Sequence, residues 1–162
     1  MDIISRYILA ITGASGMPYA LKLIQELKKN SDLELHVIIS NAARSILPME
    51  CQEWEKIIKL ADYAYNQNQL SAPMASGSWL HQGMVVCPCS MATLAAIAAG
   101  FGNNLIHRAA DVCLKENRSL ILVPRETPLN AIHLQNMLRV QQAGAVILPP
   151  SPGFYHQPRT ID

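Results

Sequence analysis

The sequence predicts a single α/β domain built on a doubly wound parallel sheet, a three-layer sandwich with helices on both faces. Short continuous apolar runs, typical of strands covered on both faces, alternate with segments that repeat apolar residues at helical spacing. The 162 residues suit one domain, and they contain no internal repeat, low-complexity tract or linker. We therefore expect one domain over residues 1–162.

The apolar runs and the helical patterns give the expected order of elements. Strands are expected at residues 7–12, 35–40, 84–87, 120–123 and 145–148. Helices are expected at residues 18–30, 41–48, 54–60, 93–100, 105–116 and 130–143, with Ser90 and Asn104 as N-cap candidates. Residues 50–82 are the least regular part of the chain, and we expect them to form an excursion that lies over a site.

Composition argues against several classes of protein. The chain has 13 Lys and Arg against 12 Asp and Glu, a formal charge of +1, so we expect no nucleic-acid partner and no anionic membrane surface. No apolar run is long enough to span a bilayer, and the N-terminal residues lack the pattern of a signal peptide. These features favour a cytoplasmic protein.

The sequence Cys87-Pro88-Cys89 raises the question of a metal or redox site, because it directly follows an apolar run. A zinc site usually needs two close ligand pairs, and no second pair accompanies this one. Redox pairs are usually spaced Cys-x-x-Cys. We therefore expect no metal, and we expect the thiols to pack as small buried hydrophobic groups.

The carboxyl ends of the expected strands define a candidate site, because ligands bind there in doubly wound sheets. This rule selects hydroxyls, glycines, an Arg-Glu pair and a tyrosine, in residues 13–16, 40–41, 88–90, 125–126 and 153–156. Two expected helix N-termini, after Ser15 and at Ser90, suit a phosphate. The sequence predicts a small-molecule site at this rim. A plain strand-helix turn remains the alternative for residues 13–16.

Two pairs of charged residues keep both a structural and a functional interpretation. Arg125 and Glu126 follow a buried strand, where they form either a surface salt bridge or a site for anion binding and proton transfer. Arg108 and Lys115 are two turns apart on one helix face. They form either a solvated stripe or a cationic face for a polyanionic ligand.

Eight motifs follow one another along the chain. They are Thr12-Gly13-Ala14-Ser15-Gly16, Ser40-Asn41-Ala42-Ala43, Ala75-Ser76-Gly77-Ser78, Cys87-Pro88-Cys89-Ser90, Arg108-Ala109-Ala110-Asp111-Val112, Leu114-Lys115-Glu116, Val123-Pro124-Arg125-Glu126-Thr127-Pro128 and Pro152-Gly153-Phe154-Tyr155-His156-Gln157-Pro158. An ordered set of this size is far more specific than any single motif. The set resembles that of the UbiX-type flavin prenyltransferases, and the resemblance runs from about residue 7 to the last residues.

The resemblance implies a flavin-binding domain whose three-layer sandwich is flavodoxin-like or Rossmann-like, and it implies a reaction. Dimethylallyl phosphate would give its dimethylallyl group to N5 of reduced FMN, with ring closure onto C6 and without a metal. The prenylated FMN would serve a partner decarboxylase of the UbiD type, in ubiquinone synthesis or aromatic-acid metabolism. The resemblance also implies a homo-oligomer, a dodecamer with sites shared between subunits. Whether the donor is the monophosphate or the diphosphate stays open.

The resemblance assigns roles to residues, motif by motif. FMN would be held by Gly13, Ala14, Ser15, Ser40, Ser90, Met91, Ala92, Thr93 and Arg125. The prenyl phosphate would be surrounded by Arg108, Lys115, Arg125, Glu126 and Tyr155. The catalytic residues would be Ser15 near the reacting nitrogen, Glu126 moving a proton, and Lys115 and Tyr155 stabilising the departing phosphate. Trp79 is expected to face the allylic cation.

Two other functions stay open. A homologous flavin-dependent cysteine decarboxylase would have a catalytic histidine and an asparagine-containing motif in place of Ala75-Ser76-Gly77-Ser78, and no histidine here has a matching context. An FMN-binding accessory protein without turnover is the other. The family continues into a C-terminal helix with a further basic residue, whereas this sequence stops at Asp162. We therefore expect either that the chain is truncated or that its tail lies outside this sequence. If the protein ends at Asp162, that helix is absent and FMN binding should survive better than prenyl transfer.

Overall fold

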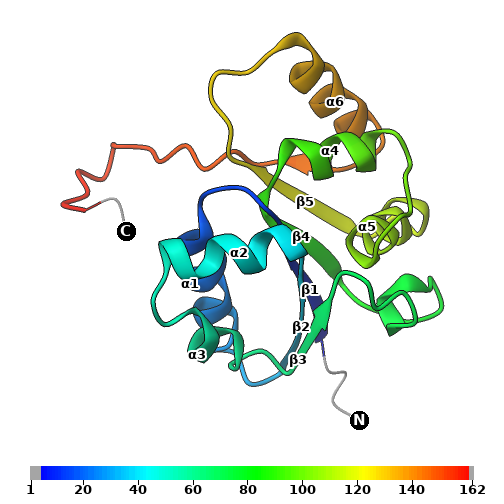
Figure 1. Cartoon of the computed structure of the whole chain (residues 1–162), viewed down its shortest axis with the longest axis horizontal. Coiled ribbons are helices and arrows are strands. Elements are labelled where there is room, and N and C mark those ends of the chain that lie inside the picture. The colour runs from blue at the N-terminus through cyan, green and yellow to red at the C-terminus, as the bar shows by residue number, and fades with distance from the viewer. Residues whose placement is uncertain (1–4, 161–162) are drawn as a thin grey trace.

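The computed structural model describes residues 5–160, which form one parallel sheet with helices on both faces (Figure 1). The strand order is β3-β2-β1-β4-β5-β6, and every neighbouring pair is parallel. The strands are β1 (Ser5–Ile11), β2 (Leu33–Ile39), β3 (Tyr63–Asn66), β4 (Gly83–Cys89), β5 (Ser119–Pro124) and β6 (Val146–Ile147). Without the short edge strand β3, this is the flavodoxin-like order; with it, the order is that of the Rossmann fold. The predicted doubly wound sheet is confirmed.

The helices divide between the two faces of the sheet, as Figure 1 shows. One face carries α1 (Met17–Leu27), α2 (Asn41–Glu50) and α3 (Trp54–Ile58). The other carries α4 (Met91–Ala98), α5 (Leu105–Lys115), α6 (Ala131–Gln142) and the short 3-10 helix η1 (Pro73–Ala75). Each layer buries its own apolar cluster against the sheet. Two apolar faces on each central strand explain the continuous apolar runs of the sequence.

Polar side chains fix where the helices begin. The Ser90 hydroxyl accepts a hydrogen bond from Thr93 N at 3.2 Å, and Asn104 Oδ1 accepts one from His107 N at 3.0 Å. Both predicted N-caps are therefore confirmed. Ser40 caps α2 in the same way, through Ala43 N at 3.0 Å. These caps place two helix starts beside the carboxyl ends of β2 and β4.

One strand was not predicted, and one helix passes through a proline before it ends. The sequence pattern missed β3, because this strand has four residues and pairs only with β2 at the edge of the sheet, so it lacks a buried apolar run. The second helix was expected to end near Pro48, and α2 ends close by, at Glu50. Proline removes one helical hydrogen bond, but the fully buried Leu47 anchors this turn, and its carbonyl accepts Cys51 N at 2.9 Å.

The Cys87-Pro88-Cys89 segment belongs to the end of β4. A register shift between Val86 and Cys89 interrupts the alternation of side chains. Cys87 therefore packs among the side chains of the α1–α3 layer, and Cys89 packs in the α4–α6 layer. Burial raises the pKa of Cys87 to about 11 and that of Cys89 to about 12, so both stay thiols. The predicted burial of these two thiols is confirmed.

Within residues 5–160, neither the side chains nor the helices are arranged for a metal cluster or a membrane crossing. No group of three or more His, Cys, Asp or Glu side chains in this range has an arrangement that could hold a metal ion. None of the helices in the same range combines the length and apolarity that a membrane crossing requires.

Candidate functional site

The candidate site lies where β1 and β4 run side by side, because the chain leaves these two strands toward opposite edges of the sheet. Thr12, which is 1% exposed, joins the two strand ends. Its Oγ1 donates to Pro88 O and accepts from Ser90 N, each at 2.7 Å. The turns that carry Ser15 and Ser90 are therefore held as one unit.

The first turn of α4 can bind an anion. Ser90 Oγ accepts from Thr93 N and lies 3.0 Å from Thr93 Oγ1. Among residues 5–160, no acceptor is paired with the backbone N–H groups of Met91 and Ala92. Free N–H groups at the positive end of a helix dipole favour a phosphate. The predicted cluster of Ser90, Met91, Ala92 and Thr93 is thus brought together at the rim.

The first turn of α2 closes the rim on the other side. Ser40 N donates to Ile11 O at 3.0 Å, which places the start of α2 beside the end of β1. Gly13 lies so close to Ala42 that a Cβ atom on residue 13 would collide with the Ala42 side chain. A glycine is therefore needed where the turn passes α2. Gly13, Ala14 and Ser40 belong to one rim, as predicted.

Glu50 is a residue of the site that the sequence did not reveal. Its Oε2 accepts hydrogen bonds from Gly16 N and Met17 N, both at 2.9 Å. Burial opposes ionisation, yet the Ser15 hydroxyl, these two amides and the Arg125 cation together lower the pKa of Glu50. No local motif marks Glu50, because only the fold brings it to a turn more than 30 residues away.

The Glu50 contact corrects one prediction about phosphate binding. Both the start of α1 and the start of α4 were expected to suit a phosphate. The Glu50 carboxylate already occupies the N-terminus of α1, where it takes the place of an external anion. Of these two helix starts, that of α4 is the one left open for a ligand phosphate within residues 5–160.

Arg125 and Glu126 lie at the end of β5 but do not form the surface salt bridge that the sequence left open. Arg125 Nε donates to Ser15 O at 3.2 Å. Glu126 is exposed, and its Oε1 accepts the N–H of the neighbouring Thr127 at 3.0 Å. No ion pair joins these two side chains within the described range. Arg125 joins the turn after β1, while Glu126 stays open to a ligand.

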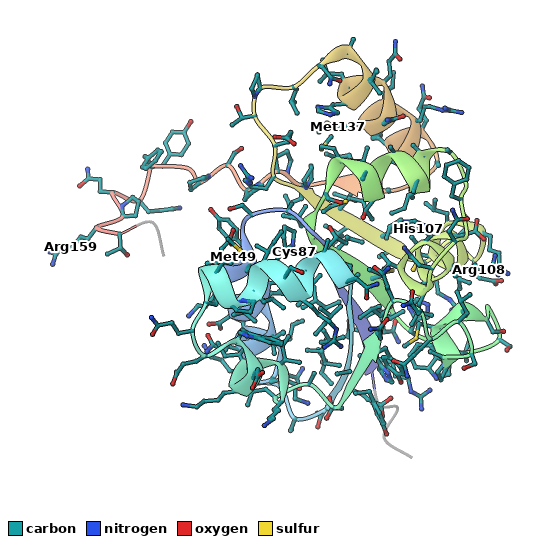
Figure 2. The ribbon with its side chains drawn as sticks, in the orientation of Figure 1. Met49, Cys87, His107, Arg108, Met137 and Arg159 are labelled. Atoms are coloured by element: carbon teal, nitrogen blue, oxygen red, sulfur yellow. The ribbon has the colours of Figure 1, made fainter. Side chains whose placement is uncertain are left out.

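Three of the predicted phosphate residues are not brought to the rim by a single chain. Lys115 ends α5 and precedes β5, whereas Arg125 follows β5. The six residues of β5 thus separate them by about 20 Å. Arg108 lies on the outer surface of α5, on the side of the molecule opposite Arg159, as Figure 2 shows. Tyr155 lies in the tail that leaves β6, and it is 95% exposed.

A groove of about 840 Å³ runs along α1 and shares Ser15, Gly16 and Glu50 with the rim. Its other lining residues belong mainly to helices, among them Tyr19, Lys22 and Ile57. The groove therefore lies beside the strand ends instead of over them. The unpaired amides of α4 are absent from its lining, so we place the flavin site at the rim.

The comparison with known proteins gives the family. The Flavoprotein family model matches residues 2–158. The flavin prenyltransferase UbiX of Methanocaldococcus jannaschii is 46% identical over 158 residues, which cover 97% of this chain and 85% of that protein. The chain belongs to the UbiX-type flavin prenyltransferases. The resemblance drawn from the eight motifs is confirmed.

Other UbiX-type flavin prenyltransferases agree with this assignment. LpdB of Lactiplantibacillus plantarum is 48% identical over 96% of this chain and 84% of its own length. The crystal structure of AnUbiX (PadA1) in complex with FMN and dimethylallyl pyrophosphate has a TM-score of 0.93 and 47% identity. It covers 97% of this chain and 84% of that one.

Two further structures concern assembly and the rival function. A dodecameric FMN-dependent UbiX-like decarboxylase of Escherichia coli O157:H7 has a TM-score of 0.94 at 43% identity, over 97% of this chain and 86% of that one. The FMN-dependent cysteine decarboxylase SpaF has a TM-score of 0.73 at 15% identity, over 93% and 86% of the two chains. This second likeness concerns the fold alone, whereas UbiX-type flavin prenyltransferases match in sequence as well.

Proposed function

We propose that this chain transfers the dimethylallyl group of dimethylallyl phosphate to reduced FMN. One observation carries the proposal: Thr12 joins an open anion-binding helix start at Ser90 to the turn that holds Ser15. The same fold and 47% of the residues recur in a protein whose structure contains both FMN and dimethylallyl pyrophosphate. The allylic carbon–oxygen bond breaks, a carbon–nitrogen bond forms, and phosphate leaves.

The residues of the rim fit FMN. The free amides of Met91 and Ala92, with the hydroxyls of Ser90 and Thr93, are suited to its phosphate. Gly13 and Ala14 allow the backbone to approach a flat ring, and Ser40 lies beside them. Reduced FMN supplies the nucleophilic N5 that accepts the prenyl group.

Ser15, Glu50 and Arg125 form a charged unit beside this place. Glu50 is held ionised, so its carboxylate can accept a hydrogen bond from the Ser15 hydroxyl and orient it. The same carboxylate can receive a proton from a ligand. Arg125 fixes the Ser15 carbonyl and adds a positive charge for the flavin or the prenyl phosphate. Glu126 is the exposed carboxylate of the rim, and we assign it the proton transfer that accompanies ring closure.

A second copy of the chain supplies the remaining cations in this proposal. Lys115 and Arg108 would cross from a neighbouring α5 to the prenyl phosphate, because one chain keeps Lys115 away from the rim. Tyr155 would approach from the exposed tail. Large apolar side chains exposed in the described range support self-association, among them Phe101, Ile132 and Leu138, which are 55%, 66% and 56% exposed. We extend the dodecamer of the Escherichia coli relative to this chain.

We further propose that the prenylated FMN serves a UbiD-type decarboxylase in the cytoplasm. A flavin altered at N5 and C6 cannot serve the chain that makes it as an acceptor again, so the product must pass to another protein. The bound dimethylallyl pyrophosphate in the AnUbiX complex makes the diphosphate a donor to be compared with the monophosphate.

The decisive experiment mixes the protein anaerobically with reduced FMN and dimethylallyl phosphate, or the diphosphate, and determines the mass of the flavin. A gain of one five-carbon dimethylallyl unit in place of one hydrogen supports the proposal. Tight FMN binding with an unchanged flavin mass supports the accessory function instead. Decarboxylation of a cysteine-terminated peptide, with no gain in flavin mass, would support the rival enzyme.

A further inference from the structure

The segment Ser76–Trp79 forms a tight turn between η1 and β4, near the amino ends of the strands and so at the end of the sheet opposite the rim. The Ser76 and Ser78 hydroxyls lie 2.9 Å apart, and Trp79 N donates to Ser76 O at 3.3 Å. These local contacts shape the turn but do not attach it to the rest of the domain. We call it the Ser76–Trp79 turn.

One side chain fastens this turn to the end of α5. Arg118 Nη1 donates to Trp79 O at 2.9 Å, and Nη2 donates to Gly77 O at 2.6 Å. Arg118 N itself donates to Cys113 O at 2.8 Å, so the residue is fixed to the last turn of α5. A planar guanidinium can hold two carbonyls at once, which a lysine ammonium cannot do with the same geometry.

The fastened turn determines where Lys115 can lie. The Lys115 ammonium pairs with the Glu116 carboxylate, and the pair rests on the backbone of Gly77. A Cβ atom added at residue 77 would come within 2.8 Å of Lys115 Nζ and would also collide with Glu116. These atoms are the ends of flexible side chains. A larger residue at position 77 would therefore move the ammonium without breaking the fold.

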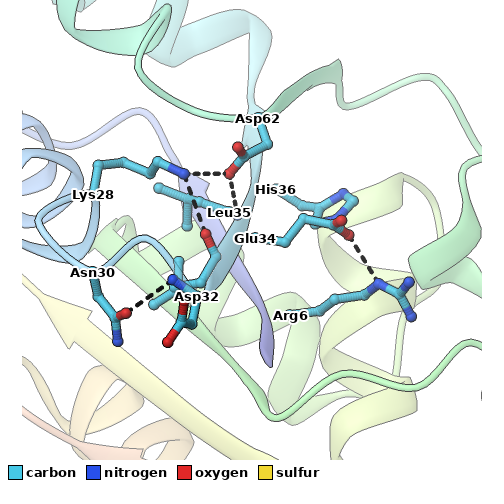
Figure 3. A network of polar contacts seen from close by, with 9 residues as sticks. Arg6, Lys28, Asn30, Asp32, Glu34, Leu35, His36 and Asp62 are labelled. Atoms are coloured by element: carbon cyan, nitrogen blue, oxygen red, sulfur yellow. Dashed lines mark hydrogen bonds and ion pairs between the residues drawn. The ribbon is translucent and has the colours of Figure 1, made fainter. Parts of the chain in front are cut away.

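The Trp79 ring is held from its other side. Its ring meets His36 edge to face, with the centroids 4.8 Å apart, and the Arg6 guanidinium lies 5.5 Å from its centroid. Arg6 Nε in turn donates to Glu34 Oε1 at 2.8 Å, as Figure 3 shows. The ring is thus held by the sheet, while its backbone carbonyl is held by Arg118.

We propose that Arg118 is a positioning residue for prenyl transfer, which places the Lys115 ammonium and the Trp79 ring for use by a second copy. This inference rests on the proposed function, in which Lys115 binds the prenyl phosphate and Trp79 faces the allylic cation. The Nη1 and Nη2 groups of Arg118 both donate to the turn, so Arg118 acts through its neighbours instead of touching the substrate.

The test compares Arg118→Lys and Gly77→Ala with wild type, and uses Arg139→Lys as the matched control. Arg139 is exposed on α6, and no hydrogen bond or ion pair of its side chain occurs in the described range. We expect Arg118→Lys to raise the KM for dimethylallyl phosphate about tenfold, the effect of losing one charged hydrogen bond. The Kd for FMN should stay within about twofold, because the flavin rim is untouched.

Hydrogen exchange separates positioning from general damage. Arg118→Lys should speed amide exchange in residues 76–79 and leave the amides of β1 and β4 unchanged. Gly77→Ala should raise the KM by displacing Lys115 while these amides stay protected, and Arg139→Lys should change neither quantity. If Arg118→Lys fails to fold, the KM of Gly77→Ala still tests whether the position of Lys115 matters.

Three results would overturn the inference. The first is that wild type is active and both variants have the same KM for dimethylallyl phosphate as wild type. The second is faster exchange in residues 76–79 without a change in KM. The third is an FMN Kd that weakens as much as the KM rises. An inactive wild type would instead contradict the proposed function itself, and the two failures are therefore distinguishable.

Discussion

Thr12 Oγ1 accepts a hydrogen bond from Ser90 N at 2.7 Å, and this one contact joins the turn after β1 to the start of α4. The same hydroxyl donates to Pro88 O at 2.7 Å. A completely buried hydroxyl with two partners is costly to remove, because both partners would be left unpaired. The relation also sets the spacing between the Ser15 turn and the proposed phosphate site.

Thr12→Val keeps the shape of this side chain and removes its hydroxyl. We expect the free energy of unfolding to fall by about 2–3 kcal/mol, since a buried donor and a buried acceptor lose their partners. The FMN Kd should rise about tenfold as the two turns lose their fixed spacing. Urea unfolding and flavin titration measure the two effects. Thr12→Ser, which retains the hydroxyl, should recover most of the FMN affinity; equal losses in both variants would contradict this role.

Glu50→Gln tests the carboxylate at the start of α1. The folded pKa of Glu50 lies below the ordinary value of 4.5, so its ionised form stabilises the fold above that pH. This stability is lost as the pH falls through the lowered folded pKa. We expect wild type to exceed Glu50→Gln by about 1 kcal/mol at pH 7, and the difference to shrink below pH 4.5. Urea unfolding at several pH values measures it.

Glu53→Gln is the control for this pH dependence, because Glu53 is exposed and forms a surface ion pair with the nearby Lys56. It should change the stability by less than about 0.5 kcal/mol at any pH. A difference between wild type and Glu50→Gln that stays constant from pH 7 to pH 3 would contradict the proposed ionised state.

The cysteines and Ser90 should respond in opposite ways to substitution. Cys87→Ala and Cys89→Ala remove buried atoms and should cost about 1–2 kcal/mol of stability each, with FMN binding and prenyl transfer retained. Ser90→Leu should weaken FMN binding at least about tenfold, because its side chain would fill the cap position. Flavin titration measures FMN binding, and the mass of the flavin measures prenyl transfer. If the cysteine variants fold and bind FMN but no longer transfer the prenyl group, the thiols take part in the mechanism.

Sites shared between copies can be tested by complementation. Lys115→Ala and Glu126→Gln should each lower kcat at least about a hundredfold and leave the FMN Kd within about twofold. If neighbouring copies contribute Lys115 and Glu126 to one site, co-expression of the two variants should restore sites that contain both residues. Activity well above that of either variant alone is the expected result. Activity equal to the sum of the separate variants would show that each chain supplies both residues.

The alternation of apolar runs and helical patterns was sufficient to predict the sheet, because strands buried on both faces must be apolar throughout. The caps at Ser90 and Asn104 were predictable for a similar reason, since a side-chain acceptor at a helix start acts over three residues. The edge strand β3 escaped prediction, because its four residues bury too little to leave a pattern.

The sequence by itself determined the doubly wound fold, the family, and the turns that form the rim. Only the tertiary structure decided that Glu50 occupies the start of α1, that Cys87 and Cys89 face opposite layers, and that β5 keeps Lys115 away from Arg125. The physical reason is one of range. Local patterns encode burial and capping within a few residues, whereas these contacts depend on register and on elements that meet across the sheet.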